Sequence, residues 1–514
     1  MYPGLHAQRT PDKAAVILAE SGRVVTYRQL EDRSAALARV FHDAGLRAGD
    51  VVAVLSDNTA EVFDVYWATL RSGLYITAIN HHLTAAEAAY IVRDSGAGAL
   101  VVSAALTELA AEVDQLCPGP CLRLAFGGEI PGFDSYERAI AGAAGPLPEI
   151  PCGAVMLYSS GTTGFPKGVK PPLPDRQVDE PGDPIVAIAE RIFGLGEQDV
   201  YLSPAPIYHA APLRWCGMMQ ALGGTVVLMT KFDAEATLKY IEKYQVTAAQ
   251  MVPTMFVRLL KLDEGTRHRY DVSSLRVLIH AAAPCPVDVK QAMIGWLGPV
   301  IYEYYSSTEA HGMTFINSED WLAHPGSVGR SVLGVLHICD DDGRELPSGE
   351  IGTVYFERDQ MPFEYHNDPV KTAEAQHPAH PLWTTVGDLG YAGEDGYLYL
   401  ADRKSFMIIS GGVNIYPQEV ENALALHPAV FDVAVIGIPH PEMGEEVKAV
   451  VQLVAGVEKT DAVAASLIGY VRDRIAHFKV PRSVDFVDDL PRTPTGKLVK
   501  NKLKEQFASA RKQL

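Results

Sequence analysis

The sequence has few cysteines and no long apolar run, and both absences narrow its class. Six cysteines are spread over 514 residues, and their spacing matches neither a disulfide framework nor a zinc site. No stretch of 18 apolar residues occurs, and the N-terminal residues lack the apolar core of a secretion signal. The composition therefore predicts a reduced, cytoplasmic protein without a transmembrane segment.

The chain also lacks an excess of positive charge. Its formal net charge is -19 at pH 7, which argues against nucleic acid or an anionic membrane as a partner of the whole molecule. The C-terminal stretch 492–512 is an exception, because its basic residues far outnumber its single glutamate. That basic patch is either a solvated helix face or a landing site for phosphates.

One common phosphate-binding signature is missing, but a stretch rich in glycine, serine and threonine is present after an apolar run. G-x-x-x-x-G-K-[ST] does not occur. Residues 158–169, Tyr-Ser-Ser-Gly-Thr-Thr-Gly-Phe-Pro-Lys-Gly-Val, follow directly after the apolar run 154–157. Glycines let backbone N–H groups turn toward an anion, the hydroxyls add donors, and Lys167 adds a positive charge. The stretch predicts a phosphate cradle, and its composition alone also fits a linker.

Short apolar runs alternate with helical patterns along the first 280 residues. Strands are expected at 51–55, 99–102, 200–203, 225–229 and 275–279, and helices at 27–46, 61–70 and 234–243. This alternation predicts parallel sheets covered by helices on both faces.

The pattern changes near Ser327. Residues 328–356 hold shorter β-type runs around a turn, which predicts a small antiparallel, β-barrel-like unit. After the polar trio 402–404 come about 110 residues with their own strand and helix patterns, enough for a separate domain. We therefore expect an α/β protein with mixed or parallel sheets in an N-terminal domain, 1–402, and a small α+β C-terminal domain, 403–514.

Six segments in a fixed order resemble one enzyme superfamily. Besides 158–169, they are Pro-Ile-Tyr-His at 206–209, Tyr-Glu-Tyr-Tyr-Ser-Ser-Thr-Glu at 302–309, Val-Gly-Asp-Leu-Gly at 386–390, the stretch 402–421, and Pro-Arg-Thr-Pro-Thr-Gly-Lys at 491–497. In this order the set resembles the adenylate-forming enzymes, which include acyl-CoA and aryl-CoA synthetases, amino-acid adenylation domains and firefly luciferase. The resemblance spans essentially the whole chain. It implies ATP, Mg²⁺ and coenzyme A as cofactors or co-substrates of an acid:CoA ligase.

Such a reaction has a clear physical need for these parts. A carboxylate is a poor electrophile, so joining it to a thiol requires a leaving group. Attack of the carboxylate on the α-phosphate of ATP makes an acyl-adenylate and expels pyrophosphate. Two anions must meet in that step, so cations and hydrogen-bond donors that neutralise the crowded oxygens are the main catalytic resource.

The resemblance implies roles for single residues in this step. Lys497 would bridge the substrate carboxylate and the α-phosphate, and Glu309 would bind Mg²⁺. Tyr305 would lie against the adenine ring, and Asp388 would accept hydrogen bonds from the ribose hydroxyls. The full set of implied ATP-binding residues is Ser159, Ser160, Gly161, Thr162, Thr163, Gly164, Lys167, Ala282, Ala283, Pro284, Glu303, Tyr304, Tyr305, Thr308, Asp388 and Arg403.

The resemblance also implies that the C-terminal domain is mobile. Its hinge would be Lys404 or Ser405, so that one orientation presents Lys497 for adenylation and another serves thioester formation. Small residues in the second orientation would let the pantetheine arm approach the backbone. The implied CoA-binding residues are Ser410, Gly411 and Gly412.

The acid itself would enter near His209, which aligns with the family's gate between acyl pocket and nucleotide and is counted among the catalytic residues. Trp215 and Met218, in the helical stretch 210–222, are candidate pocket walls, and both also fit ordinary core packing. Ala210 stands where amino-acid adenylation domains tend to carry an aspartate for the α-ammonium group. An amino-acid substrate is therefore not expected, which favours coenzyme A as the acceptor. The expected acid is hydrophobic, either medium or long in chain or aryl or steroid-like in shape.

Two alternative functions remain in play. A free-standing adenylating enzyme would load the phosphopantetheine of a carrier protein and show little activity with free CoA. A nucleotide-binding regulator without chemistry would form no AMP, and the presence of Lys497, Glu309 and Asp388 together argues against it. The sequence leaves open which acid is used and whether the chain forms a homodimer.

Overall fold

The computed structural model describes residues 2–143, 145–147, 149–159, 166–403, 406–425, 427–492 and 498–510. Packing divides the chain into two compact units. One unit comprises Met1–Gln250, Gly265–Leu278 and Met361–Ala373, and the other comprises Met251–Glu264, Ile279–Gln360 and Glu374–Leu514. Within the described part of the chain, no helix is both long and apolar enough to cross a lipid bilayer.

The first unit contains a six-stranded sheet in which every pairing is parallel. Its order is β7-β6-β5-β3-β4-β8, with bounds β3 (Val51–Leu55), β4 (Tyr75–Ile79), β5 (Ala97–Ser103), β6 (Leu122–Phe126), β7 (Asp134–Ser135) and β8 (Ala154–Val155). Strands β3 and β4 are buried at every position, as expected when helices cover both faces. The neighbouring helices are α2 (Tyr27–Asp43), α3 (Glu61–Leu70), α4 (Ala85–Asp94), α5 (Thr107–Leu116) and α6 (Tyr136–Ala141).

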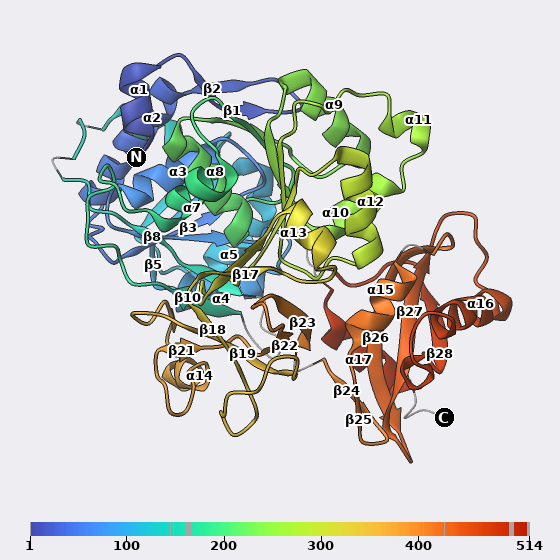
Figure 1. Ribbon diagram of the computed structural model, residues 1–514. Helices are drawn as coiled ribbons and strands as arrows, with labels where there is room; N and C mark the ends of the chain where they lie inside the picture. The colour runs from blue at the N-terminus through green and yellow to red at the C-terminus, as the bar shows by residue number, and fades with distance from the viewer. Residues whose placement is uncertain are drawn as a thin grey trace. The chain divides into compact units, whose positions relative to one another are not determined.

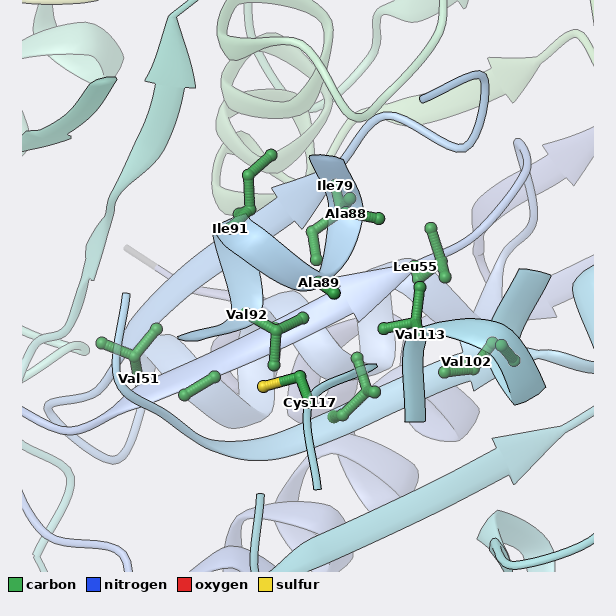
Figure 2. Close-up of a cluster of buried hydrophobic side chains, with 14 of the residues drawn as sticks. Val51, Leu55, Ile79, Ala88, Ala89, Ile91, Val92, Val102, Val113 and Cys117 are labelled. Carbon is green, nitrogen blue, oxygen red and sulfur yellow. The ribbon is translucent and has the colours of Figure 1, made fainter. Parts of the chain in front are cut away.

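Helices α4 and α5 pack their apolar sides onto this sheet (Figure 2). Ala88 and Val92 of α4 and Val113 of α5 are buried against strand residues such as Leu55 and Val102. Helix α4 begins at a capping box, in which the Thr84 hydroxyl accepts a bond from the Glu87 backbone and the Glu87 carboxylate accepts one from the Thr84 N–H. The local sequence therefore determines where α4 begins, and the buried apolar residues determine which side of α4 faces the sheet.

A second sheet in this unit carries β1 (Ala14–Leu18), β2 (Val24–Thr26), β11 (Val200–Ser203), β12 (Thr225–Leu228) and β13 (Ala248–Met251). The β1–β12, β12–β11 and β11–β13 pairings are parallel, and β2 is added antiparallel to β1. Further helices of this unit are α1 (Pro3–Arg9), α7 (Pro184–Phe193), α8 (Ala210–Leu222) and α9 (Ala234–Tyr244). Helix α8 is buried on almost every side.

A third, very small sheet of this unit follows the order β20-β10-β9 and is antiparallel throughout. Its strands are β9 (Leu157–Ser159), β10 (Lys167–Lys170) and β20 (Glu364–Tyr365). The central strand, β10, begins at Lys167 and so contains the last residues of the predicted phosphate cradle.

In the second unit, strand β14 (Val277–His280) ends at a buried histidine. Strands β15 (Ile301–Tyr305), β16 (Met313–Ile316) and β17 (Arg330–Leu333) form an antiparallel set. Helices α10 (Pro253–Leu260) and α12 (Val287–Leu297) pack on each other, and α13 (Ser318–Ala323) follows β16 along the chain.

The predicted β-barrel-like unit is an open antiparallel sheet. Its strands are β18 (Val335–Cys339), β19 (Gly352–Glu357), β21 (Trp383–Thr384), β22 (Asp388–Ala392) and β23 (Leu398–Arg403). All its pairings are antiparallel, and no closed barrel is needed to describe it. Phe356, Val354 and Leu398 form its buried face together with Tyr305.

The C-terminal sheet has two long strands, β26 (Val430–His440) and β27 (Gly444–Leu453), of which β27 also pairs with β24 and β28 (Figure 1). Around them lie β24 (Ile408–Ser410), β25 (Val413–Ile415) and β28 (Ser483–Val487), with helices α15 (Pro417–Leu424), α16 (Asp461–Arg472) and α17 (Lys500–Ala510). Val433 and Val435 belong to one apolar cluster and Ala434 and Ile436 to another. Both faces of the sheet are thus buried, because successive side chains of a strand point to opposite sides.

The α/β class with parallel sheets and flanking helices is confirmed. The domain boundary expected at residues 402–404 stays a prediction, and β23 runs up to it.

Candidate active site

Two predicted nucleotide-binding residues of the second unit are joined by a hydrogen bond. Tyr305 is the last residue of β15 and Asp388 the first of β22. The Tyr305 hydroxyl donates a hydrogen bond of 2.7 Å to Asp388 Oδ2, and both residues are 9% exposed. A carboxylate has about four acceptor positions, so this bond orients the Asp388 side chain and is compatible with a ribose at the other positions.

Arg403 lies opposite Asp388 in the sheet register. The two residues are cross-strand partners in the β22–β23 backbone pairing. The Arg403 backbone is described, whereas its side chain lies outside the description. Its predicted contact with the ribose stays a prediction.

The carboxylate of Glu303 has a partner inside the protein. Glu303 lies two residues before Tyr305 on β15, and its Oε2 accepts a 2.5 Å bond from Lys290 Nζ on α12. Lys290 is fully buried, and its ammonium lies 4.9 Å from the centre of the Trp321 ring. Burial raises the pKa of Glu303, and the Lys290 charge opposes that rise. The buried ion pair therefore links β15 to α12. A contact of Glu303 with ATP stays a prediction.

His280 completes this buried cluster. Its Nε2 lies 3.4 Å from Glu303 Oε2, and its ring packs edge-on against Phe256. Burial, and next the Lys290 charge, lower the pKa of His280 well below its usual value. The imidazole is therefore neutral, and Lys290 supplies the positive charge next to Glu303.

Two alanines near the site have left-handed backbone conformations. Ala282, in the predicted adenine wall formed with Ala283 and Pro284, has φ +75°, and Ala310, directly after Glu309, has φ +51°. A non-glycine residue in that region is strained by about 1–3 kcal/mol, and such residues gather at ligand sites. In the sequence the two alanines lie directly before and after a stretch that holds Glu303, Tyr305 and Glu309, and both belong to the second unit.

The turn that carries Thr308 and Glu309 is closed by its neighbours. The Ser306 hydroxyl donates a 2.7 Å bond to the Gly312 carbonyl, and Ser307 Oγ lies 2.8 Å from His311 Nδ1. Glu309 is 8% exposed. Among the described residues no group of three or more His, Cys, Asp or Glu side chains could hold a metal. One carboxylate fits Mg²⁺ that is bound chiefly by nucleotide phosphates and water.

The predicted phosphate cradle belongs to the first unit, and only its two ends are described. Tyr158 and the backbone of Ser159 belong to β9, and Lys167 begins β10. Lys167 Nζ lies 5.2 Å from the centre of the Tyr365 ring on β20. Cradle residues 160–165 lie outside the described residues, and they include the predicted ATP-binding residues Ser160, Gly161, Thr162, Thr163 and Gly164.

The candidate acyl-pocket residues also belong to the first unit. His209 is half-buried beside the ring of Tyr208, with ring centres 4.5 Å apart. Trp215 and Met218 are buried, and Trp215 packs against Phe193 and Tyr201. These contacts fit the alternative of core packing. The roles of His209, Trp215 and Met218 in an acyl pocket stay predictions.

Two histidines beside this gate were missed from the sequence. His81 and His82 follow β4 after one intervening residue, and their ring centres lie 4.2 Å apart, with that of His81 5.3 Å from the Tyr208 ring centre. Burial, and next the neighbouring His82, lower the pKa of His81. A pair of histidines just beyond the end of a buried strand was the available signal, because ligands bind at the carboxyl ends of parallel strands.

The predicted CoA-binding segment is a tight hairpin turn between β24 and β25. Ser410 pairs with Val413, and Gly411 and Gly412 between them have φ +59° and +79°. Two consecutive left-handed positions are what a type I′ turn requires, and they favour glycine strongly. The predicted hinge residues Lys404 and Ser405 and the predicted catalytic Lys497 lie outside the described residues.

Comparison with known proteins agrees with this arrangement over the whole chain. Residues 5–366 match the family described as AMP-binding enzyme, and residues 419–497 match the AMP-binding enzyme C-terminal domain. A feruloyl-CoA synthase from Amycolatopsis sp is 33% identical over 513 residues, 98% of each chain. The fatty acid–acyl-carrier-protein ligase ScoC from Streptomyces coeruleorubidus is 30% identical over 519 residues, covering 99% of this chain and 96% of that protein.

A solved structure extends the likeness to three dimensions. It is o-succinylbenzoate CoA synthetase from Bacillus subtilis in complex with its acyl-adenylate intermediate, which aligns with a TM-score of 0.80 at 27% identity over 98% of this chain and 97% of the other. The family matches cover well over half of the residues. The chain therefore belongs to the AMP-binding enzymes of the adenylate-forming superfamily.

Proposed function

We propose that this protein is an AMP-forming acid:CoA ligase for a hydrophobic carboxylic acid. The observation that supports the proposal most is the hydrogen bond between Tyr305, which ends β15 four residues before Glu309, and Asp388, which begins β22. Residues 83 positions apart in sequence meet there, at the two places where the resemblance implies adenine and ribose. The names of the relatives, a CoA synthase and an acyl ligase, support the same reaction class.

In the first half-reaction the substrate carboxylate attacks the α-phosphorus, and the bond to the pyrophosphate oxygen breaks. Lys497 would neutralise charge on the meeting oxygens, and Asp388 and Tyr305 would hold the ribose and base. Mg²⁺, when bound by Glu309 and the phosphates, would supply further neutralisation. In the second half-reaction the CoA thiolate attacks the acyl carbonyl and AMP leaves, so that the products are acyl-CoA, AMP and pyrophosphate.

The proposed acid lacks an α-ammonium group. Ala210 follows the gate residue His209 at the start of α8, so no carboxylate at this position would pair such a cation, and burying an unpaired charge is strongly unfavourable. The relatives' names include a feruloyl group and a fatty acid, which supports an aryl or aliphatic acid. We also expect the protein to act in the cytoplasm.

The test is AMP release over a panel of fatty, aryl and steroid carboxylic acids, each with and without CoA. The proposal expects AMP formation that requires one class of acid and increases with CoA. AMP formation with none of the acids would favour a nucleotide-binding regulator. A stoichiometric burst of pyrophosphate with an acid, but no turnover with CoA, would redirect the search to a carrier protein.

The carrier-protein reading is the second candidate function, because one relative with similar coverage is named as an acyl-carrier-protein ligase. In that case a phosphopantetheinylated carrier would replace CoA in the same assay. Turnover with the carrier and little with free CoA would support this candidate.

Tyr305→Phe is expected to raise the KM for ATP by roughly tenfold, because a hydrogen bond to a charged group contributes about 1.5–3 kcal/mol. The ring that lies against adenine is kept, while the bond that orients Asp388 is lost. Tyr302→Phe, on the same strand with its side chain on the opposite face, is the matched control. Initial rates of pyrophosphate release against ATP concentration measure both, and an unchanged KM in Tyr305→Phe would contradict the role.

A further inference from the structure

Asp94 occupies an unusual place for a carboxylate. It is the last residue of α4, where the carbonyl ends of the helix repel negative charge. Helix α4 itself is held firmly, because Ala88, Ala89, Ile91 and Val92 are buried against the six-stranded sheet (Figure 2). The carboxylate is therefore attached to a rigid point, and partners on other elements offset the unfavourable position.

Those partners come from both edges of the three-stranded sheet. The Tyr158 hydroxyl, on edge strand β9, donates a 2.6 Å bond to Asp94 Oδ2. The Asn367 amide, just beyond edge strand β20, donates a 3.1 Å bond to the Asp94 backbone carbonyl and lies 3.5 Å from its Oδ1. One residue thus holds the two outer strands to the same helix end.

The central strand between these edges is β10, which begins with Lys167. Backbone pairs join Lys167 to Ser159 on one side and Val169 to Tyr365 on the other. A Cβ on Gly168 would come within 3.0 to 3.1 Å of Tyr158 and His366, so the central strand fits closely between its neighbours. The Lys167 ammonium also lies over the Tyr365 ring.

A sheet this small depends on outside support. Its strands are two to four residues long, and short, few-stranded sheets are marginally stable by themselves. The position of Lys167 on β10 therefore depends on how firmly the neighbouring strands β9 and β20 are anchored. Tyr158 also packs against the core under α4, and burial together with the Asp94 bond raises its pKa, so the hydroxyl keeps its proton as a donor.

We propose that Asp94 is a positioning residue for ATP binding, which clamps β9 through Tyr158 and β20 through Asn367 and thereby sets the position of Lys167. The inference rests on the proposed function, in which Lys167 meets the phosphates of ATP. Asp94 itself touches no substrate in this scheme.

The test compares variants that break each arm of the clamp. Tyr158→Phe removes one hydroxyl, and Asn367→Gly removes the amide while allowing the left-handed backbone that Asn367 has at φ +57°. Each is expected to raise the KM for ATP by roughly tenfold, with the KM for the acid and kcat within about twofold of the original. Asp94→Ala removes the acceptor for Tyr158 but keeps the backbone carbonyl to which the Asn367 amide donates, so it is expected to match Tyr158→Phe. Asp94→Asn keeps an acceptor for Tyr158 and is expected to stay within about threefold of the original chain.

Tyr90→Phe is the matched control. Tyr90 also hydrogen-bonds to Asp94, but it belongs to α4 itself and links no strand to the helix. Its variant is expected to leave the KM for ATP unchanged. Equal effects of Tyr90→Phe and Tyr158→Phe, or a Tyr158→Phe enzyme with an unchanged KM for ATP, would overturn the proposal. So would a loss of kcat that Asp94→Asn shares with Asp94→Ala.

Binding of a fluorescent ATP analogue to the full chain separates this inference from the proposed function. If no acid supports turnover, the proposed function fails, while the clamp still predicts weaker analogue binding in Tyr158→Phe and Asn367→Gly than in Tyr90→Phe. If turnover occurs and all three variants bind the analogue equally, the proposed function stands and the clamp is wrong. Thermal unfolding midpoints within a few degrees of the original chain show that the variants are folded.

Discussion

Lys497→Ala is expected to lower the rate of acyl-adenylate formation by roughly 10²-fold or more, which is the scale for losing one electrostatic contact in a transition state. The carboxylate and the α-phosphate repel each other as they meet, and by resemblance this lysine is the cation between them. Thioester formation from a pre-formed acyl-adenylate involves no such meeting of anions. We therefore expect the reaction of synthetic acyl-AMP with CoA to stay near its original rate.

Pyrophosphate exchange measures the first half-reaction and acyl-CoA formation from acyl-AMP the second. Lys502→Ala is the control, since Lys502 belongs to the same basic stretch and is exposed on α17. If the basic stretch acts only through its total charge, both variants will show the same small effect. Near-normal pyrophosphate exchange in Lys497→Ala would refute the assigned role.

Lys290→Met is expected to lower the free energy of unfolding by about 3–5 kcal/mol, because it leaves the Glu303 carboxylate buried without its cation. Both partners are almost completely buried. Urea unfolding followed by tryptophan fluorescence suits this site, because Trp321 lies directly beside the Lys290 ammonium. Arg269→Met is the control: its pair with Glu235 is about half exposed on both sides, and such a pair contributes at most about 1 kcal/mol.

The same variant has a predictable dependence on pH. Burial already raises the pKa of Glu303 above its usual 4.5, and Lys290 opposes that rise. Without Lys290 the folded-state pKa rises further, so the folded chain binds more protons than the unfolded chain between the two pKa values. Stability then falls as pH rises through that window. The loss in Lys290→Met is therefore expected to be smaller near pH 5 than near pH 8.

A second variant keeps this prediction decisive. Lys290→Met combined with Glu303→Gln buries no net charge and is expected to recover part of the lost stability and to lose the pH dependence. A destabilisation that is equal at both pH values, and equal in the single and double variants, would show that lost packing and not the unpaired carboxylate is responsible.

Elements set by local pattern were predictable from the sequence. Strands 51–55 and 200–203 and helix 61–70 have the expected bounds, since apolar runs and helical spacing depend on near neighbours. Strand 275–279 is found two residues later at its start, as Val277–His280. Polar residues lie around the start of this apolar run, so the local sequence does not indicate the residue at which strand pairing begins.

Buried polar partners were not predictable, because they join distant segments. From the sequence alone, Lys290 would be predicted to be an exposed lysine on a helix. Tertiary packing places it against Glu303 and Trp321. Asp94 and Asn367 are 273 positions apart. For the candidate site, the motifs indicated Tyr305 and Asp388 separately, but no pattern in the sequence indicated the bond between them.

The left-handed backbone of Ala282 and Ala310 has a consequence for the entropy of binding under the proposed function. A glycine with the same backbone could move between left-handed and right-handed conformers, and a ligand would have to select one of them. A methyl group removes most of those alternatives, which limits the loss of loop entropy on binding, a loss of about 1–2 kcal/mol for each backbone unit that a ligand freezes. The strain of both turns is met when the chain folds, so that, if ATP binds here as proposed, less of the backbone remains to be ordered on binding.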